Sequence, residues 1–193
     1  IVLKNAKKTI ASCSLLNQEE SNALFKIGGV DSFAAISLKN QTITGAFNRI
    51  VKKFPMQSAV RENGQDITYH EIDQLSSQVA INLIEAGIKK NDIVACFIPK
   101  SKDLLIALLG IMKAGGVYLP VDVTLPATRI EYILKDSQCK ICLFIDLKPH
   151  NNVNNCSYVD LNGFLKVNAS DILAPVIFGS DLAYMIYTSG STG

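Results

Sequence analysis

The stretch DIVACFIPKSKDLLIALLGIMKAGGVYLPV, residues 92–121, decides the fold of this chain. Its first part is a short apolar run that stops at Pro99, which is typical of a buried strand. Ser101 can then cap a helix that continues to about Ala114, and the nearly continuous apolar surface of this helix predicts packing on several sides. Gly115-Gly116 breaks the helix before a second apolar run at residues 117–121. This order predicts a strand, a helix and a second strand.

The same alternation continues toward the C-terminus. Pro126 suits the first turn of another helix, and residues 139–145 are a further apolar run. Residues 146–180 are rich in Asn, Asp, Ser and Gly, which predicts an irregular stretch with a strand near Tyr158. A final buried strand is expected at residues 182–187. Strands that alternate with helices predict an α/β fold with a mainly parallel sheet, flanking helices and right-handed crossovers.

The part before residue 92 predicts two more helices and a hairpin. Apolar side chains recur at helical spacing in residues 43–51, and Pro55 ends that helix. Asn63-Gly64, placed between two short strand-like runs, is a strong hairpin signal. The next helix has an apolar stripe along residues 72–83, and Gly87 is its expected stop.

Residues 1–40 differ in character from the rest of the chain. The sequence from Asn17 to Glu20 is close to a capping box and predicts a short helix up to Ile27, which Gly28-Gly29 ends. Residues 31–41 look like a linker. We therefore expect a linker and tail of a preceding domain at 1–40, and a second domain at 41–193.

Composition excludes several classes of function. Hydrophobic residues make up 48% and charged residues 19% of the 193 residues, and the net charge is +2, which fits a globular core and no nucleic-acid surface. The apolar run at residues 104–112 is shorter than the ~20 residues that span a bilayer, and the N-terminus shows no signal-peptide pattern. Five cysteines, an odd number, predict free thiols in a reducing, cytoplasmic setting.

The segment after the expected final strand has the composition of a phosphate-binding loop. It combines two glycines, which let backbone N–H groups approach a ligand, with four hydroxyl side chains, which are donors to phosphate oxygens. A loop at the carboxyl end of a strand is where α/β sheets bind ligands. By composition alone, a flexible Ser/Gly turn explains the segment equally well. It is not a Walker loop, because it lacks that spacing and its lysine.

The string LAYMIYTSGSTG, residues 182–193, resembles the phosphate-loop signature of the adenylate-forming enzyme superfamily. Two upstream elements, MKAGGVYLPVD at 112–122 and ITYHEI at 67–72, resemble elements of the adenylation domains of nonribosomal peptide synthetases, in the same order. The sequence is identified as a member of that family from about Thr42 onward. Residues 16–20 also resemble the helix that joins a condensation domain to an adenylation domain. After the element at 112–122, Pro126, Arg129-Ile130 and Asp136-Ser137 match the next helix of that family.

The resemblance implies activation of an amino acid with ATP and Mg²⁺ as an aminoacyl adenylate, then thioester transfer to the phosphopantetheine of a carrier protein. It implies carrier and condensation domains as partners, with no nucleic acid and no membrane. The catalytic lysine, the Mg²⁺ carboxylate and the substrate pocket come later in the family, so the catalytic residues are unknown and the isolated chain is expected to be inactive. The residues that it assigns to the pyrophosphate cradle are Thr188, Ser189, Gly190, Ser191, Thr192 and Gly193.

Three other functions stay open at this point. One is another adenylate-forming ligase, such as a D-alanine–carrier-protein ligase or an acyl-CoA synthetase. The second is a truncated, inactive chain or an interaction module. The third is a flavodoxin-like nucleotide-binding module, which predicts its loop near the first strand rather than after several strands.

Metal, redox and dinucleotide sites are discounted. Cys139 and Cys142 have C-x-x-C spacing, but residues three apart on a regular strand point to opposite faces, and Cys156 stands alone. His70 and His150 are expected on the surface. The glycines near residue 115 do not form a dinucleotide fingerprint.

Overall fold

The computed structural model describes residues 16–27, 42–149, 153–166 and 174–188. The chain divides into two compact units, Ile1–Leu38 and Lys39–Gly193, and each is described by itself. The first unit contains helix α1 (Gln18–Ile27). Asn17 Oδ1 accepts from the Glu20 N–H, and Glu20 Oε2 accepts from the Asn17 N–H, both at 2.8 Å. This reciprocal pair confirms the predicted capping box.

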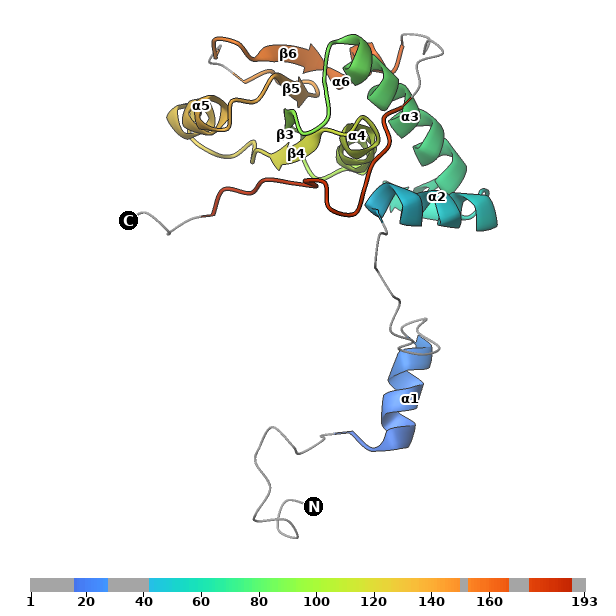
Figure 1. The fold of residues 1–193 in the computed structure, drawn as a ribbon. Coiled ribbons are helices and arrows are strands. Elements are labelled where there is room, and N and C mark those ends of the chain that lie inside the picture. Colours follow the sequence, from blue (N-terminus) through green and yellow to red (C-terminus); the bar gives the residue numbers. More distant parts are fainter. Residues whose placement is uncertain (1–15, 28–41, 150–152, 167–173, 189–193) are drawn as a thin grey trace, which may run out of the picture. The chain divides into compact units, whose positions relative to one another are not determined.

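The second unit is built on a parallel sheet of four strands in the order β4-β3-β5-β6 (Figure 1). Strand β3 therefore has neighbours on both sides, and its Val94 is in register with Tyr118 of β4 and Ile141 of β5. The parallel sheet predicted from the alternating pattern is confirmed. The strands are β3 (Ile93–Phe97), β4 (Val117–Pro120), β5 (Ile141–Phe144) and β6 (Ser157–Asp160).

Helices cover both faces of this sheet, because its strands alternate their side chains between two apolar cores. Val94 and Cys96 of β3 belong to a core shared with α3 and α4, whereas Ala95 and Phe97 belong to one shared with α5. In Figure 1, α5 accordingly lies on one side of the sheet, and α3 and α4 lie on the other. The helices are α3 (Tyr69–Glu85), α4 (Lys102–Lys113), α5 (Ala127–Asp136) and α6 (Leu161–Phe164).

Local sequence signals account for most of the boundaries. Thr68 and Glu71 form a capping box at the start of α3, and the Ser101 hydroxyl accepts from the Leu104 N–H at the start of α4. Gly87, with φ of 90°, follows the end of α3 in the left-handed region. Pro126 takes the N-cap position of α5, one residue before the helix, and contributes no side-chain cap.

The predicted hairpin and first helix of this unit are also present. Strands β1 (Ser58–Glu62) and β2 (Gln65–Thr68) pair antiparallel around Asn63-Gly64, whose φ values of 51° and 79° are those of a type I′ turn. Helix α2 (Ile43–Lys53) begins at the Thr42 cap. Its Val51 is buried, but Ile43 and Ile50 are largely exposed.

The prediction of a buried final strand at residues 182–187 is wrong. The segment is extended, but it meets β4 through a single bridge, Tyr118 to Tyr184. Two backbone hydrogen bonds hold it there, Tyr118 N–H to Ala183 O at 3.1 Å and Met185 N–H to Tyr118 O at 2.9 Å. The physical reason is that no described residues cover the face on which alternate side chains of this segment lie, and Leu182, Tyr184 and Ile186 are 58–64% exposed.

The stretch 146–180, which was expected to be irregular with one strand, contains a short helix as well as a strand. The one-turn helix α6, capped by Asp160, was not predicted within the stretch 146–180. The expected strand near Tyr158 is present as β6. Within the described ranges, no helix has both the length and the apolar character that a membrane crossing requires.

Candidate functional site

A cavity of about 460 Å³ lies where the β3 and β4 chain segments leave the sheet at their carboxyl ends. Lys100 follows β3, Asp122 follows β4, and Arg129 comes from the first turns of α5. Residues 186–188 line the same cavity. The cavity therefore gathers residues from distant parts of the chain, with Lys100 and Thr188 88 residues apart, at the edge of the sheet where α/β folds bind ligands.

The charges of this cavity suit an anion. Lys100 and Arg129 both line it and are both exposed to solvent, so their ammonium and guanidinium groups remain available to a ligand. The Arg129 guanidinium also lies 5.1 Å from the centre of the Tyr132 ring, a cation–π contact that restricts its position. Residues 188–193 contain no Lys or Arg, and the tertiary structure brings two cations to the cavity that Thr188 lines.

Among the described residues that line the cavity, Asp122 is the one with a carboxylate side chain. Its Oδ1 accepts from both the N–H and the hydroxyl of Thr124, each at 2.8 Å. These two hydrogen bonds, with a smaller contribution from Lys100, lower the pKa of Asp122 below its usual value. The carboxylate thus shapes the turn after β4 and balances part of the positive charge.

Tyr187 attaches the end of the 182–187 segment to helix α5. Its hydroxyl donates to Asp136 Oδ2 at 2.5 Å, and its ring meets the Tyr132 ring edge-on, with centroids 6.4 Å apart. Burial, followed by the bond to Asp136, raises the pKa of Tyr187 above its usual value. The phenol therefore keeps its proton and remains the donor across the neutral range.

Of the six residues predicted as the pyrophosphate cradle, Thr188 is described, and it is exposed at the cavity. The other five lie outside the described residues, so the cradle stays a prediction. Sequence reasoning missed Lys100 and Arg129 as ligand-facing residues. The signal that could have found Lys100 is its position directly after a predicted strand, because carboxyl ends of parallel strands converge on one edge.

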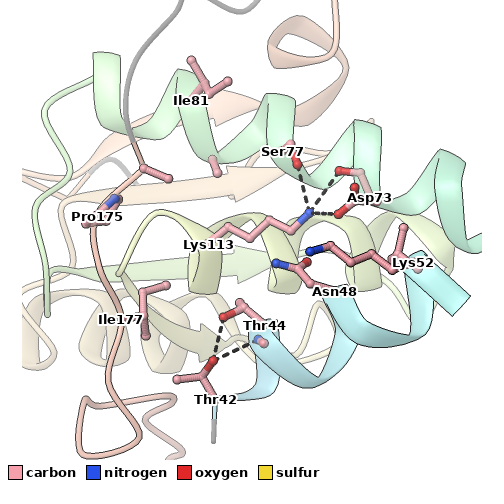
Figure 2. A pocket seen from close by; sticks show the side chains of 14 residues that line it. Thr42, Thr44, Asn48, Lys52, Asp73, Ser77, Ile81, Lys113, Pro175 and Ile177 are labelled. Atoms are coloured by element: carbon pink, nitrogen blue, oxygen red, sulfur yellow. Dashed lines mark hydrogen bonds and ion pairs between the residues drawn. The ribbon is translucent and has the colours of Figure 1, made fainter.

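A second cavity, of about 570 Å³, is bordered by α2, α3, α4 and residues 174–177 (Figure 2). Its central polar group is Lys113 Nζ, which donates to Asp73 Oδ1 at 2.6 Å, Ser76 Oγ at 2.8 Å and Ser77 Oγ at 3.0 Å. The Asp73 carbonyl oxygen, at 3.0 Å, is a fourth acceptor, so the three N–H donors of the ammonium group are fully used. Lys113 is thus committed to joining α4 to α3, and we assign this cavity a structural role.

The cysteine arrangement differs from the expectation. Cys139 precedes β5 rather than lying on it, and it shares one core with Cys142, so the two side chains do not diverge to opposite faces. Cys156 does not stand alone, because its Sγ lies 3.3 Å from Cys139 Sγ. The described residues contain no group of three or more side chains arranged to hold a metal. His70 is exposed, and His150 lies outside the described residues.

A mainly parallel α/β fold with an anion-compatible cavity at its carboxyl edge defines a ligand-binding α/β protein. The sequence model of the AMP-binding enzyme family matches residues 47–193, and the chain belongs to this family. The family match covers the sheet, the cavity and the predicted cradle together.

Curated relatives and solved structures point to one branch of the family. The chain is 35% identical over 195 residues to gramicidin S synthase 2 of Aneurinibacillus migulanus and 35% identical over 192 residues to bacitracin synthase 3 of Bacillus licheniformis. Both alignments cover 100% of this chain, and it spans 4% and 3% of the length of these relatives.

The solved structures that resemble this chain also include nonribosomal peptide synthetases. The N-terminal subdomain of Klebsiella oxytoca NpsA, in complex with 3-hydroxybenzoyl-AMSN, superposes with a TM-score of 0.74 and 27% identity, over 84% of this chain and 41% of that one. The nonribosomal peptide synthetase FmoA3 gives a TM-score of 0.72 and 26% identity, over 78% of this chain and 16% of that one.

Proposed function

We propose that this chain forms the first part of an amino-acid-activating adenylation domain of a nonribosomal peptide synthetase. The observation that carries the proposal is the position of Thr188, where the predicted cradle begins, at a cavity that also receives Lys100 and Arg129. Family membership and the likeness to peptide synthetases support the same assignment.

The reaction that we propose begins with attack of an amino-acid carboxylate oxygen on the α-phosphorus of ATP. The bond from that phosphorus to the bridging oxygen breaks, and pyrophosphate leaves with the electron pair. Charge therefore grows on the β- and γ-phosphates, and oriented donors lower the barrier by binding that charge. The hydroxyl and N–H groups of residues 188–193 would serve as those donors, and Lys100 and Arg129 would supply fixed positive charge.

A thiol of phosphopantetheine on a carrier domain would then attack the acyl carbon and release AMP. We propose carrier and condensation domains as partners, with residues 1–40 as the connection to a preceding condensation-like domain. The relatives support this, since one similar structure is an artificially fused adenylation–PCP di-domain of Klebsiella oxytoca. We also propose a cytoplasmic location, which fits the buried free thiols of the described part of the chain.

Mg²⁺ is implied by the ATP chemistry, and the described residues do not by themselves form its site. One carboxylate, Asp122, lines the described part of the cavity, and its Oδ1 is already used by Thr124. Mg²⁺ bound to nucleotide takes one or two carboxylates together with phosphate oxygens. We assign no role to Asp122 in metal binding.

The test is amino-acid-dependent exchange of labelled pyrophosphate into ATP by the polypeptide in which this chain occurs. We expect saturable exchange with one or a few amino acids, and none by the 193-residue chain alone. Exchange with fatty or aryl acids instead would favour an acyl-CoA synthetase, and the absence of exchange with every acid would contradict ligation.

The cavity cations give a matched test of the site. Lys100→Ala and Arg129→Ala should each raise the KM for ATP about tenfold, because each removes a charge-assisted contact to phosphate. Lys140→Ala is the control, since Lys140 bonds Asp92 at 2.8 Å before strand β5 and lies outside the cavity lining. Equal effects of all three variants would contradict this location of the phosphate site.

A further inference from the structure

Tyr187 is the last residue before the predicted phosphate loop. Its side chain points toward the core, whereas those of alternate residues before it point to solvent. Leu182, Tyr184 and Ile186 are 64%, 60% and 58% exposed, whereas Tyr187 packs against the core on the α5 face of the sheet. An extended chain alternates its side chains in this way. Tyr187 therefore fastens the segment to the body of the protein at the point where the loop begins.

The backbone provides little other support at this point. The last backbone hydrogen bond from the segment to β4 is the one from Met185 N–H to Tyr118 O, two residues earlier. Beyond it, Tyr187 is held by its hydroxyl contact with Asp136 and its ring contact with Tyr132. Both partners belong to α5, the helix that also carries Arg129 into the cavity.

We propose that Tyr187 and Asp136 are positioning residues that hold Thr188, the first residue of the predicted phosphate loop, beside α5 and so set its distance from Arg129. The inference rests on the proposed function, because it assigns this contact a role in binding the phosphates of ATP. A hydrogen bond to a charged acceptor contributes more free energy than one to a neutral acceptor. The single bond from the Tyr187 hydroxyl to Asp136 is therefore enough to favour one position of Thr188.

Variants of Tyr187 and Asp136 can test the contribution of their hydrogen bond separately from the other contacts of the two side chains. Tyr187→Phe removes the donor but keeps the ring contact with Tyr132. Asp136→Ala removes the acceptor, whereas Asp136→Asn keeps an acceptor oxygen at the same place. The matched control is Lys135→Ala, which removes the neighbouring surface ion pair with Glu131 from the same helix.

Pyrophosphate exchange by the polypeptide in which this chain occurs gives the first readout. Tyr187→Phe and Asp136→Ala should each raise the KM for ATP about tenfold and leave the KM for the amino acid within about twofold. The double variant should be no worse than either single variant. Asp136→Asn should lie between wild type and Asp136→Ala, because it keeps an acceptor oxygen but loses the charge, and Lys135→Ala should stay near wild type. Parallel rises in both KM values, or no rise, would overturn the positioning role.

Hydrogen exchange gives a second readout that does not depend on ligation. Amides of residues 186–193 should exchange faster in Tyr187→Phe and Asp136→Ala than in wild type, with those of β3 and β5 unchanged. Unchanged loop amides would overturn the inference even if the enzyme is active. Faster loop exchange in a protein that activates no acid would support the positioning and contradict the proposed function, so the two failures are distinguishable.

Discussion

Gly110 of α4 lies against Val79 of α3 so closely that a Cβ at position 110 would come within 2.5 Å of Val79 Cγ1 and 3.0 Å of the Ser76 carbonyl oxygen. Real side chains do not approach that closely, so the two helices pack at this distance because one of them carries no side chain there. The contact joins the helices that cover one face of the sheet.

Gly110→Ala should therefore destabilise the protein, by about 1–3 kcal/mol, because α3 and α4 must move apart in a packed core. Chemical denaturation of both proteins measures the difference. Gly163→Ala is the matched control: nothing lies within 4 Å of its Cβ position, and alanine favours helix, so its stability should be unchanged or slightly higher. A loss at Gly163 equal to that at Gly110 would contradict this account.

Removing Asp73 should cost more than removing Lys113. The Lys113 side chain is 10% exposed and the Asp73 side chain 31%, so Asp73→Ala leaves the more buried charge without its carboxylate partner. We expect Asp73→Ala to lower the free energy of unfolding by about 2 kcal/mol, which is what a hydrogen bond to a charged group contributes. Lys113→Met keeps the apolar stem and leaves Asp73 within reach of water, so its loss should be smaller. Urea unfolding measures both, and the reverse order would contradict the structural role given to this pair.

The hairpin carries an ion pair that is open to direct titration. The Arg61 guanidinium and then the Ser58 hydroxyl hydrogen-bond to Asp66 and lower its pKa to about 2. In Arg61→Ala the pKa of Asp66, followed by NMR of its carboxyl carbon, should return toward 3.8. A value near 2 in that variant would show that Arg61 is not the cause.

The sign of the accompanying pH dependence follows from the lowered pKa. Between pH 3.8 and about 2 the unfolded chain binds more protons at Asp66 than the folded one, so this contribution to stability is present above that window and is lost as the pH falls through it. Asp66→Asn should remove this part of the slope, which denaturation at several pH values can measure.

Cys139 and Cys156 should form a disulfide under mild oxidation. Their sulfur atoms are 3.3 Å apart, and the hydrogen bond between them raises the pKa of Cys139 and lowers that of Cys156, which makes Cys156 the attacking thiolate. With diamide as oxidant, both thiols lose their hydrogens to the diazene as the sulfur–sulfur bond forms. Mass spectrometry should show a loss of about 2 Da and a linked peptide pair.

Cys142→Ser is the control for this oxidation, because Cys142 shares the same core but its thiol faces the Leu143 carbonyl oxygen, and the variant should still form the linked pair. Cys139→Ser should not form it. Linkage through Cys142 instead, or no linkage in the wild type, would contradict the observed geometry.

Local and periodic features of the sequence determined the elements of this protein. The apolar run at 93–98, the Ser101 cap and the Gly115 break predicted the strand, helix and strand that the structure shows, because each signal acts over a few residues. Asn63-Gly64 and the Asn17 capping box succeeded for the same reason. The family was evident from contiguous motifs.

The tertiary structure alone decided which distant residues meet. Residues 182–187 were expected to be buried because they are apolar, but burial of a strand depends on what packs over its faces, and alternate side chains of this segment are exposed. The cavity that unites Thr188 with Lys100 and Arg129, the 3.3 Å approach of Cys139 to Cys156 and the bond from Tyr187 to Asp136, 51 residues earlier, depend on strand order. The spacing of apolar residues does not predict strand order, because the side chains of a strand alternate in the same way whichever strand pairs with it.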